Sequence, residues 1–212
     1  MQHTKFKKDI RSWKRQKVKL LVIAGRRKSG KDVLVDYLMN NYKGFKHYRI
    51  AEAPTLIAKI LELPPDRKVQ QVLFGVNKLL WPLLGESAYK RRVAKMLDRE
   101  KPRLAIVEAI RPKEEYEEFV TKRRGILIGV TASGPLRYAR ALRDSKHNQE
   151  KRDEGKMSFK EFMSRENLAI ERDIDWIVKR AHFVLDNNYQ THTPFYKLVD
   201  EVMQELGFKR KK

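Results

Sequence analysis

A short segment with two glycines offers the clearest chemistry in this chain. Residues 25–32 read Gly-Arg-Arg-Lys-Ser-Gly-Lys-Asp, between the apolar run 20–24 and a stretch with helical apolar spacing. Glycines so placed let several backbone N–H groups point at one centre, the next helix adds positive potential, and the lysine reaches terminal phosphates. The segment predicts a nucleoside triphosphate site. The expected nucleotide-binding residues are Gly25, Arg27, Lys28, Ser29, Gly30, Lys31, Asp32 and Val33.

The residue after the lysine departs from the common pattern. Most loops of this kind have Ser or Thr there, with the hydroxyl on magnesium. This chain has Asp32, whose carboxylate could ligand the metal directly, act through a water, or only cap the helix. Asp32 is one of two candidate magnesium ligands, and these three roles stay open.

A second carboxylate, Glu108, ends the apolar run 104–107, and Arg111 follows three residues later. Glu108 could hold magnesium through water or accept a hydrogen bond from an acceptor substrate; alternatively, it is a helix N-terminal acid that balances Arg111. Arg111 could bind a phosphate through its two-pronged guanidinium, or pair with Glu114 or Glu115 at the surface. We take Glu108 as a candidate catalytic and metal-binding residue, and Arg111 as a candidate catalytic and substrate-binding residue.

Three arginines recur on one predicted helix. Arg137, Arg140 and Arg143 are spaced i, i+3 and i+6, so they share a face. An almost entirely polar stretch, 144–156, follows them, and another helix is predicted from Ser158. We expect residues of about 137–165 to form a lid that closes over the triphosphate. Arg137 and Arg140 are then candidate catalytic residues, and Arg143 a nucleotide contact.

Strand and helix patterns alternate along the chain, which predicts an α/β fold with a parallel sheet of about five strands and helices on both faces. In such sheets ligands bind beyond the carboxyl ends of the strands, where the residues above lie. Strands are predicted at 18–24, 46–50, 104–107, 125–130 and 181–185, and helices at 32–41, 54–62, 67–80, 86–100, 113–123, 135–143, 158–179 and 194–206. On the helix 158–179, Glu166, Glu171 and Asp175 are expected to form solvent ion pairs with Arg165, Arg172 and Lys179.

Length and composition favour one compact unit. The 212 residues fit a single α/β domain with a substantial core. The absence of cysteine excludes disulfides and thiolate-bound zinc, and no apolar run is long enough to span a bilayer. We therefore expect a cytoplasmic protein with no membrane contact.

The formal net charge is +21, with +7 in residues 1–19, +4 in residues 209–212 and +10 in the rest of the chain, so the excess is not only an effect of the tails. Residues 1–19 hold eight basic residues against Asp9 alone, and residues 209–212 are all basic. A basic surface attracts nucleic acid through its phosphates. It equally suits an enzyme with two phosphorylated substrates, or it only raises solubility. The partners expected are a small phosphorylated metabolite and nucleic acid held by the basic tails.

Three segments resemble a known family. Residues 25–32 are similar to the loop of those adenylate-kinase-like P-loop kinases that use Asp after the lysine, namely deoxynucleoside monophosphate kinases and phosphomevalonate kinases. Residues 107–115, Val-Glu-Ala-Ile-Arg-Pro-Lys-Glu-Glu, resemble their strand-acid-x-x-Arg segment, which dephospho-CoA-kinase-like proteins share. Residues 181–187 resemble their closing strand, which ends in Asn187.

The resemblance implies a three-layer P-loop NTPase fold over residues 18–206, with 1–17 as a basic extension and 207–212 as a basic tail. It implies transfer of the γ-phosphoryl group of ATP to a small metabolite, with Mg²⁺ bridging the phosphates near Glu108 or Asp32. Lys31 would hold the β- and γ-phosphates. Glu52 would contact the acceptor. Asn187 could touch the adenine, although it could equally belong to a turn.

The acceptor is expected to be a nucleoside monophosphate, with dephospho-CoA and phosphomevalonate as alternatives. A hypothesis from another class is an ATP-gated RNA- or ribosome-binding protein anchored by its basic tails. Both a monomer and a homodimer are compatible with the sequence.

Overall fold

The computed structural model describes residues 7–64, 67–84, 87–147, 155–167 and 171–211. At its centre is a five-stranded sheet in which every neighbouring pair of strands is parallel, in the order β2-β3-β1-β4-β5. The strands are β1 (Lys19–Ala24), β2 (Phe45–Arg49), β3 (Leu104–Glu108), β4 (Ile126–Thr131) and β5 (Phe183–Asp186). The predicted parallel α/β sheet is confirmed.

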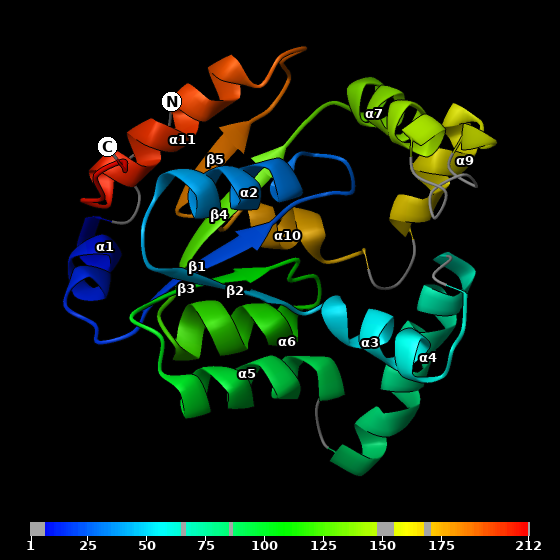
Figure 1. Ribbon diagram of the computed structural model, residues 1–212, viewed down its shortest axis with the longest axis horizontal. Helices are drawn as coiled ribbons and strands as arrows, with labels where there is room; N and C mark the ends of the chain where they lie inside the picture. The colour runs from blue at the N-terminus through cyan, green and yellow to red at the C-terminus, as the bar shows by residue number, and fades with distance from the viewer. Residues whose placement is uncertain (1–6, 65–66, 85–86, 148–154, 168–170, 212) are drawn as a thin grey trace.

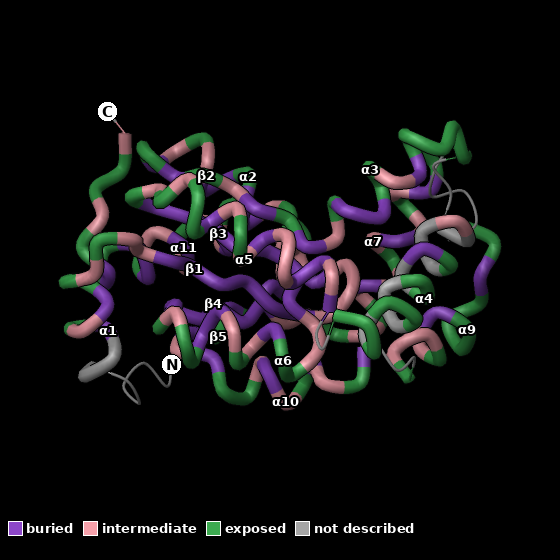
Figure 2. The backbone as a smooth tube through the Cα atoms, turned by 90° about the horizontal axis from the view of Figure 1, so that it is seen from below, coloured by how far each residue is buried: buried purple, intermediate pink, exposed green. Residues whose placement is uncertain are grey.

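The apolar runs of the sequence became the central strands. In β1 all residues after Lys19 are buried, and β3 is buried throughout, so both run through the buried middle of the molecule in Figure 2. The edge strand β2 alternates instead, with Phe45 and Tyr48 buried while Lys46 and Arg49 are exposed. A central parallel strand is covered on both faces and must be apolar, whereas an edge strand keeps polar positions.

Helices cover both faces of this sheet (Figure 1). On one face α1 (Lys7–Lys14), α2 (Lys31–Asn41) and α11 (Thr193–Glu205) pack on it through Trp13, Leu34 and Phe195. The other face carries α5 (Ala88–Glu100), α6 (Lys113–Tyr116), a π-helical turn (Glu117–Lys122) and α10 (Ile174–Val178). Among the described residues, no helix combines the length and apolarity needed to cross a membrane.

The basic ends of the chain also contribute to the core. Ile10 and Trp13, within the predicted extension 1–17, are buried in the same cluster as α2 and α11. The Trp13 indole donates to the Leu20 carbonyl at 3.0 Å, and its ring meets Phe208 edge-on. Lys211 donates to carbonyls of residues 39 and 40 at 2.9 Å. Residues at both ends therefore pack against the central domain.

Two groups of helices extend beyond the carboxyl ends of the strands. On the right of Figure 1, α3 (Glu52–Ile60) and α4 (Arg67–Leu84) lie below, and α7 (Gly134–His147) and α9 (Phe159–Ser164) lie above. The upper pair falls within the predicted lid, 137–165. Part of the polar connection that suggested the lid, residues 148–154, lies outside the described residues.

The predicted continuous helix 158–179 is wrong. After α9 a 3-10 turn covers Arg165–Asn167, residues 168–170 lie outside the described residues, and a turn at 171–173 precedes α10. The reason is a tertiary contact, because Arg26 donates to the carbonyls of Glu166 and Glu171 at 3.1 and 3.4 Å. An uninterrupted helix would use those carbonyls for its own i+4 hydrogen bonds.

Candidate functional site

The loop between β1 and α2 is shaped by its two glycines. Gly30 has φ 106° and caps α2, and a Cβ there would overlap the side-chain amide of Asn187. A Cβ on Gly25 would overlap the Val130 carbonyl of β4. Any side chain at either position would force the loop away from the sheet. The first turn of α2 therefore starts at the loop, and the N-terminal N–H groups of a helix so placed form the geometry of an anion site.

Lys31 is the first residue of α2 and donates to the Arg26 carbonyl across the loop at 3.0 Å. Burial removes water from the ammonium group and, together with repulsion from Arg111, lowers the pKa of Lys31 to about 8. Attraction by Asp32 and Glu108 raises the pKa and offsets part of this effect. A nearby anion would stabilise the charged form of a lysine in such a buried place. This is what a phosphate-binding lysine requires.

Glu108 lies at the end of β3, opposite Ile23 of β1 and Arg49 of β2 in the sheet register. Its Oε2 lies 2.9 Å from His47 Nε2 and 3.4 Å from Arg49 Nε. Its Oε1 is buried and has no hydrogen-bond partner among the described residues. A buried carboxylate oxygen without a partner is costly, so this atom is suited to meet a ligand.

The predicted alternatives for Asp32 are narrowed by the structure. Gly30, not Asp32, is the residue that caps α2, and no side chain caps this helix. Asp32 lies in the first turn with an exposed side chain, 2.6 Å from Arg49 Nη2. Helix capping by Asp32 is therefore ruled out, and its carboxylate lies at the mouth of the loop in contact with Arg49.

These residues fit a magnesium ion bound together with a nucleotide. Among the described residues, no group of three or more His, Cys, Asp or Glu side chains forms a metal site. Mg²⁺ in kinase sites commonly needs only one or two protein carboxylates, because water and phosphate oxygens complete its shell. Asp32 and Glu108 could supply these. When bound, such an ion neutralises charge on the β- and γ-phosphate oxygens.

The lid arginines reach the loop from α7. Arg137 is buried and donates to the carbonyls of Ala132 and Arg27 at 3.0 and 3.4 Å, while also pairing with Glu166. The Arg140 guanidinium donates to the Lys28 carbonyl of the loop at 3.3 Å and to the Asn187 carbonyl at 2.9 Å. Both guanidinium groups therefore lie against the phosphate loop.

Of the remaining residues predicted to bind the nucleotide, Arg143 lies away from the loop, whereas Asn187 and Lys28 have contacts at it. Arg143 is exposed on α7, so the structure does not bring it to the loop with its two neighbours. Asn187 is buried and donates to the Ser29 carbonyl at 2.8 Å. Lys28 pairs with Asp144 of α7 at 2.6 Å. Asn187 therefore ties the end of β5 to the loop.

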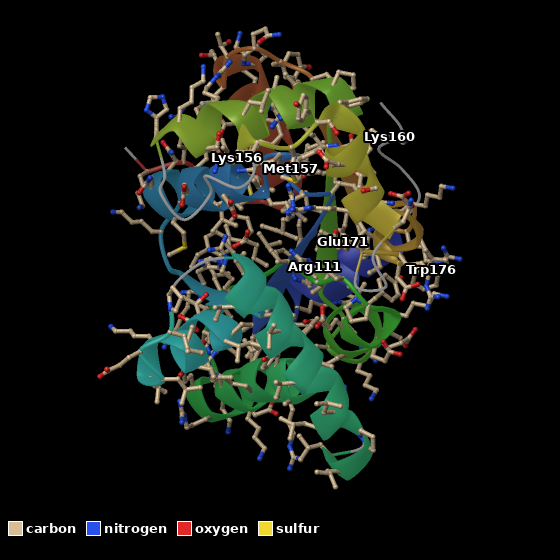
Figure 3. The ribbon with its side chains drawn as sticks, turned by 90° about the vertical axis from the view of Figure 1, so that its right-hand side faces the viewer. Arg111, Lys156, Met157, Lys160, Glu171 and Trp176 are labelled. Carbon is tan, nitrogen blue, oxygen red and sulfur yellow. The ribbon has the colours of Figure 1, made fainter. Side chains whose placement is uncertain are left out.

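The acids of segment 166–175 do not form the predicted solvent pairs. Asp175 binds Arg26 through both oxygens, at 3.0 and 2.8 Å. Glu166 pairs with Arg137, and Glu171 lies 3.4 Å from Arg111. Figure 3 shows Arg111 and Glu171 close together between the lid helices and α4. These carboxylates therefore neutralise arginines in and around the loop.

The two residues predicted to contact the acceptor, Glu52 and Arg111, have different partners in the structure. Glu52 is the first residue of α3 and pairs with Arg92 of α5 at 3.0 Å. Arg111 follows β3, and its backbone amide donates to the buried Glu115 carboxylate at 2.8 Å. The predicted surface pair between Arg111 and Glu115 is therefore replaced by a buried contact through the backbone.

Sequence reasoning missed Arg26, His47 and Arg49. Arg26 occupies a variable position of the loop pattern, so the motif carries no signal for it. His47 and Arg49 share one face of β2, and that alternation could have suggested a common role. Their contact with Glu108 depends on strand register, which the sequence does not show.

Replacing Glu166 with Gln should destabilise the protein by about 2 kcal/mol, because Arg137 would stay buried without its carboxylate. We expect MgATP to raise the melting temperature more in Glu166→Gln than in the unchanged protein, since phosphates would then supply the missing charge. Differential scanning calorimetry with and without MgATP measures both effects. Glu161→Gln, in the exposed capping box of α9, is the control. Equal MgATP shifts would contradict this role of Glu166.

Comparisons by sequence identify no relative, since no protein-family model matches the chain and no curated protein matches it. Comparison of three-dimensional structures identifies proteins with a similar fold. The crystal structure of TT1252 from Thermus thermophilus aligns with a TM-score of 0.58 and 20% identity, over 90% of this chain and 99% of that one. Shikimate kinase from Bacteroides thetaiotaomicron aligns with a TM-score of 0.55 and 14% identity, over 89% and 98%. The chain therefore shares the three-layer α/β fold of these two structures.

Proposed function

We propose that this protein is a kinase that transfers the γ-phosphoryl group of ATP to a small phosphorylated metabolite. The observation that carries the proposal is the convergence on one loop of Lys31, the N-terminus of α2, and two arginines of α7. Phosphoryl transfer depends mainly on positioning and charge neutralisation, and this arrangement supplies both. The P-loop kinase fold agrees with it.

In this proposal each residue has a defined task. Lys31 and the α2 amides bind the β- and γ-phosphates, while Arg137 and Arg140 stabilise charge on the transferred group once Glu166 no longer holds Arg137. The unpartnered Oε1 of Glu108 meets the metal shell or the acceptor. Arg111 binds the phosphate of the acceptor.

The acceptor we propose is a nucleoside monophosphate, bound between α3, α5 and Arg111. Glu52 would then contact the acceptor, with its partner Arg92 available to a phosphate. Dephospho-CoA and phosphomevalonate are alternatives, because each also offers a phosphorylated small molecule to the same arginines.

The direct test is ADP release from MgATP across ribo- and deoxynucleoside monophosphates, dephospho-CoA and phosphomevalonate. Stimulation by one acceptor, lost in Lys31→Ala, would identify the reaction. Tight ATP binding without stimulation by any of them would refute the proposal for these acceptors and favour a nucleotide-gated binding protein.

ATP binding should take up protons at a pH of about 8. The free Lys31 has its pKa lowered to about 8, so it is partly neutral there, and bound phosphates would restore its charge. Affinity should consequently fall as the pH rises above about 8. Calorimetry in two buffers of different ionisation enthalpy measures the uptake. In Lys31→Arg, whose guanidinium keeps its proton, the buffer dependence should vanish; if it persists, another group takes up the proton.

The net charge of +21 favours nucleic acid as a second partner. Because both ends of the chain contribute to the core, charge removal tests this better than truncation. We expect Lys5, Lys7, Lys8 and Lys209, all replaced by Gln, to weaken RNA binding and flatten its salt dependence while kinase turnover is kept. Filter binding over a salt series measures this. An unchanged salt slope would argue against the tails as an RNA anchor.

A further inference from the structure

One arginine from the edge strand lies between the two carboxylates that the loop could offer a metal. Arg49 ends β2, and its Nη2 lies 2.6 Å from Asp32 Oδ1. Its Nε lies 3.4 Å from Glu108 Oε2. A single guanidinium therefore bridges Asp32 and Glu108.

A second observation shows that this place is built to meet a ligand. Glu108 is 1% exposed, and its Oε1 has no hydrogen-bond partner among the described residues. Its other oxygen is held by His47 and Arg49. The pKa of Arg49 is raised by Glu108 and Asp32, and more weakly by Asp36 one turn along α2, although burial opposes this. The negative potential at this place therefore attracts cations.

We infer that Arg49 competes with the divalent cation for Asp32 and Glu108, so that this protein binds free metal weakly and takes it up together with the nucleotide. The inference deepens the proposed function, because it concerns the metal that accompanies ATP. It makes Arg49 a residue that sets how the metal is loaded.

The charges explain why nucleotide and metal should enter together. Asp32 and Glu108 carry two negative charges, which Lys31 and Arg49 balance. Adding Mg²⁺ alone would leave an excess of two positive charges in a partly buried site, whereas the phosphates of ATP would compensate them. The side chain of Arg49 is 46% exposed, so it can move towards solvent without disturbing the core.

Geometry leads to the same conclusion. Mg²⁺ requires six oxygen ligands in a near-octahedral shell, close to the metal. A guanidinium in contact with both carboxylates leaves no room for such a shell between them. Arg49 must therefore move before one ion can take a ligand from both Asp32 and Glu108.

The test is a titration of the nucleotide-free protein with Mn²⁺. Electron paramagnetic resonance measures binding as the decrease of the signal of free Mn²⁺. We expect Arg49→Gln to bind Mn²⁺ about tenfold more tightly than the unchanged protein. Adding Asp32→Asn to that variant should remove the gain. Arg92→Gln, which removes a similarly exposed arginine paired with Glu52, should leave Mn²⁺ affinity unchanged.

An unchanged Mn²⁺ affinity in Arg49→Gln would overturn the inference, because Arg49 would then have no effect on metal binding. A weaker affinity would also overturn it, because Arg49 would then be needed to orient Glu108. Melting curves check that the variant folds, and Arg49→Lys, which keeps the charge, should show little gain. The result is separate from the proposed function. Tighter Mn²⁺ binding without kinase turnover would refute only that function, whereas turnover without tighter binding would refute only the role of Arg49.

Discussion

Replacing Lys31 with methionine is expected to lower kcat/KM for MgATP-dependent phosphoryl transfer about 100- to 1000-fold, the usual cost of losing one preorganised donor to a reacting group. Lys31 is the first residue of α2, donates across the loop and is desolvated. No other lysine has this combination among the described residues of the loop, since Lys28 pairs with Asp144 of the lid. Steady-state kinetics with the acceptor found in the panel would measure the loss.

The matched control for Lys31→Met is Lys46→Met on the edge strand β2. Lys46 is 55% exposed and forms a surface pair with Glu100, which contributes little to stability. It should keep full turnover. If both variants lost activity equally, the effect would come from charge or folding, and the assignment of Lys31 to the phosphates would be wrong.

Replacing Trp13 with alanine should lower the free energy of unfolding by about 3–5 kcal/mol, the range for truncating a large buried aromatic residue. Trp13 is 0% exposed in the cluster shared with α2 and α11. The variant loses this packing, the hydrogen bond to the Leu20 carbonyl and the contact with Phe208. Urea unfolding followed by circular dichroism would measure the change.

Arg11→Ala is the control for Trp13→Ala, because Arg11 is exposed on the same helix and surface changes usually stay within about 0.5 kcal/mol. A loss below about 1 kcal/mol in Trp13→Ala would show that α1 is not part of the cooperative core. The expected result also means that deleting residues 1–16 would remove core packing together with charge.

Local patterns predicted the fold and the phosphate loop. Apolar runs of four to six residues at 20–24, 104–107 and 125–130 became buried parallel strands. Gly25 and Gly30 occupy positions where a Cβ would overlap neighbouring atoms. These features depend on neighbours along the chain and on backbone sterics, so a single sequence carries them.

The partners of the site residues could not be predicted in the same way. The helix 158–179 was wrong because Arg26 takes carbonyls that the helical pattern assigns to the helix itself. Likewise, Glu166, Glu171 and Asp175 bind Arg137, Arg111 and Arg26 instead of their sequence neighbours. Charged side chains on a helix have equally good local partners, and only the folded chain decides between these and distant ones.

The sequence by itself determined a glycine-containing loop between a strand and a helix of a parallel α/β sheet, because strand, glycine and helix signals are local. Only the tertiary structure decided what surrounds that loop. His47 and Glu108 are 61 positions apart, and Arg26 and Asp175 are 149 apart. Such contacts follow from the register of the strands and the packing of the helices. Many small packing interactions across the whole core determine both, so no short segment of the sequence carries a pattern for them.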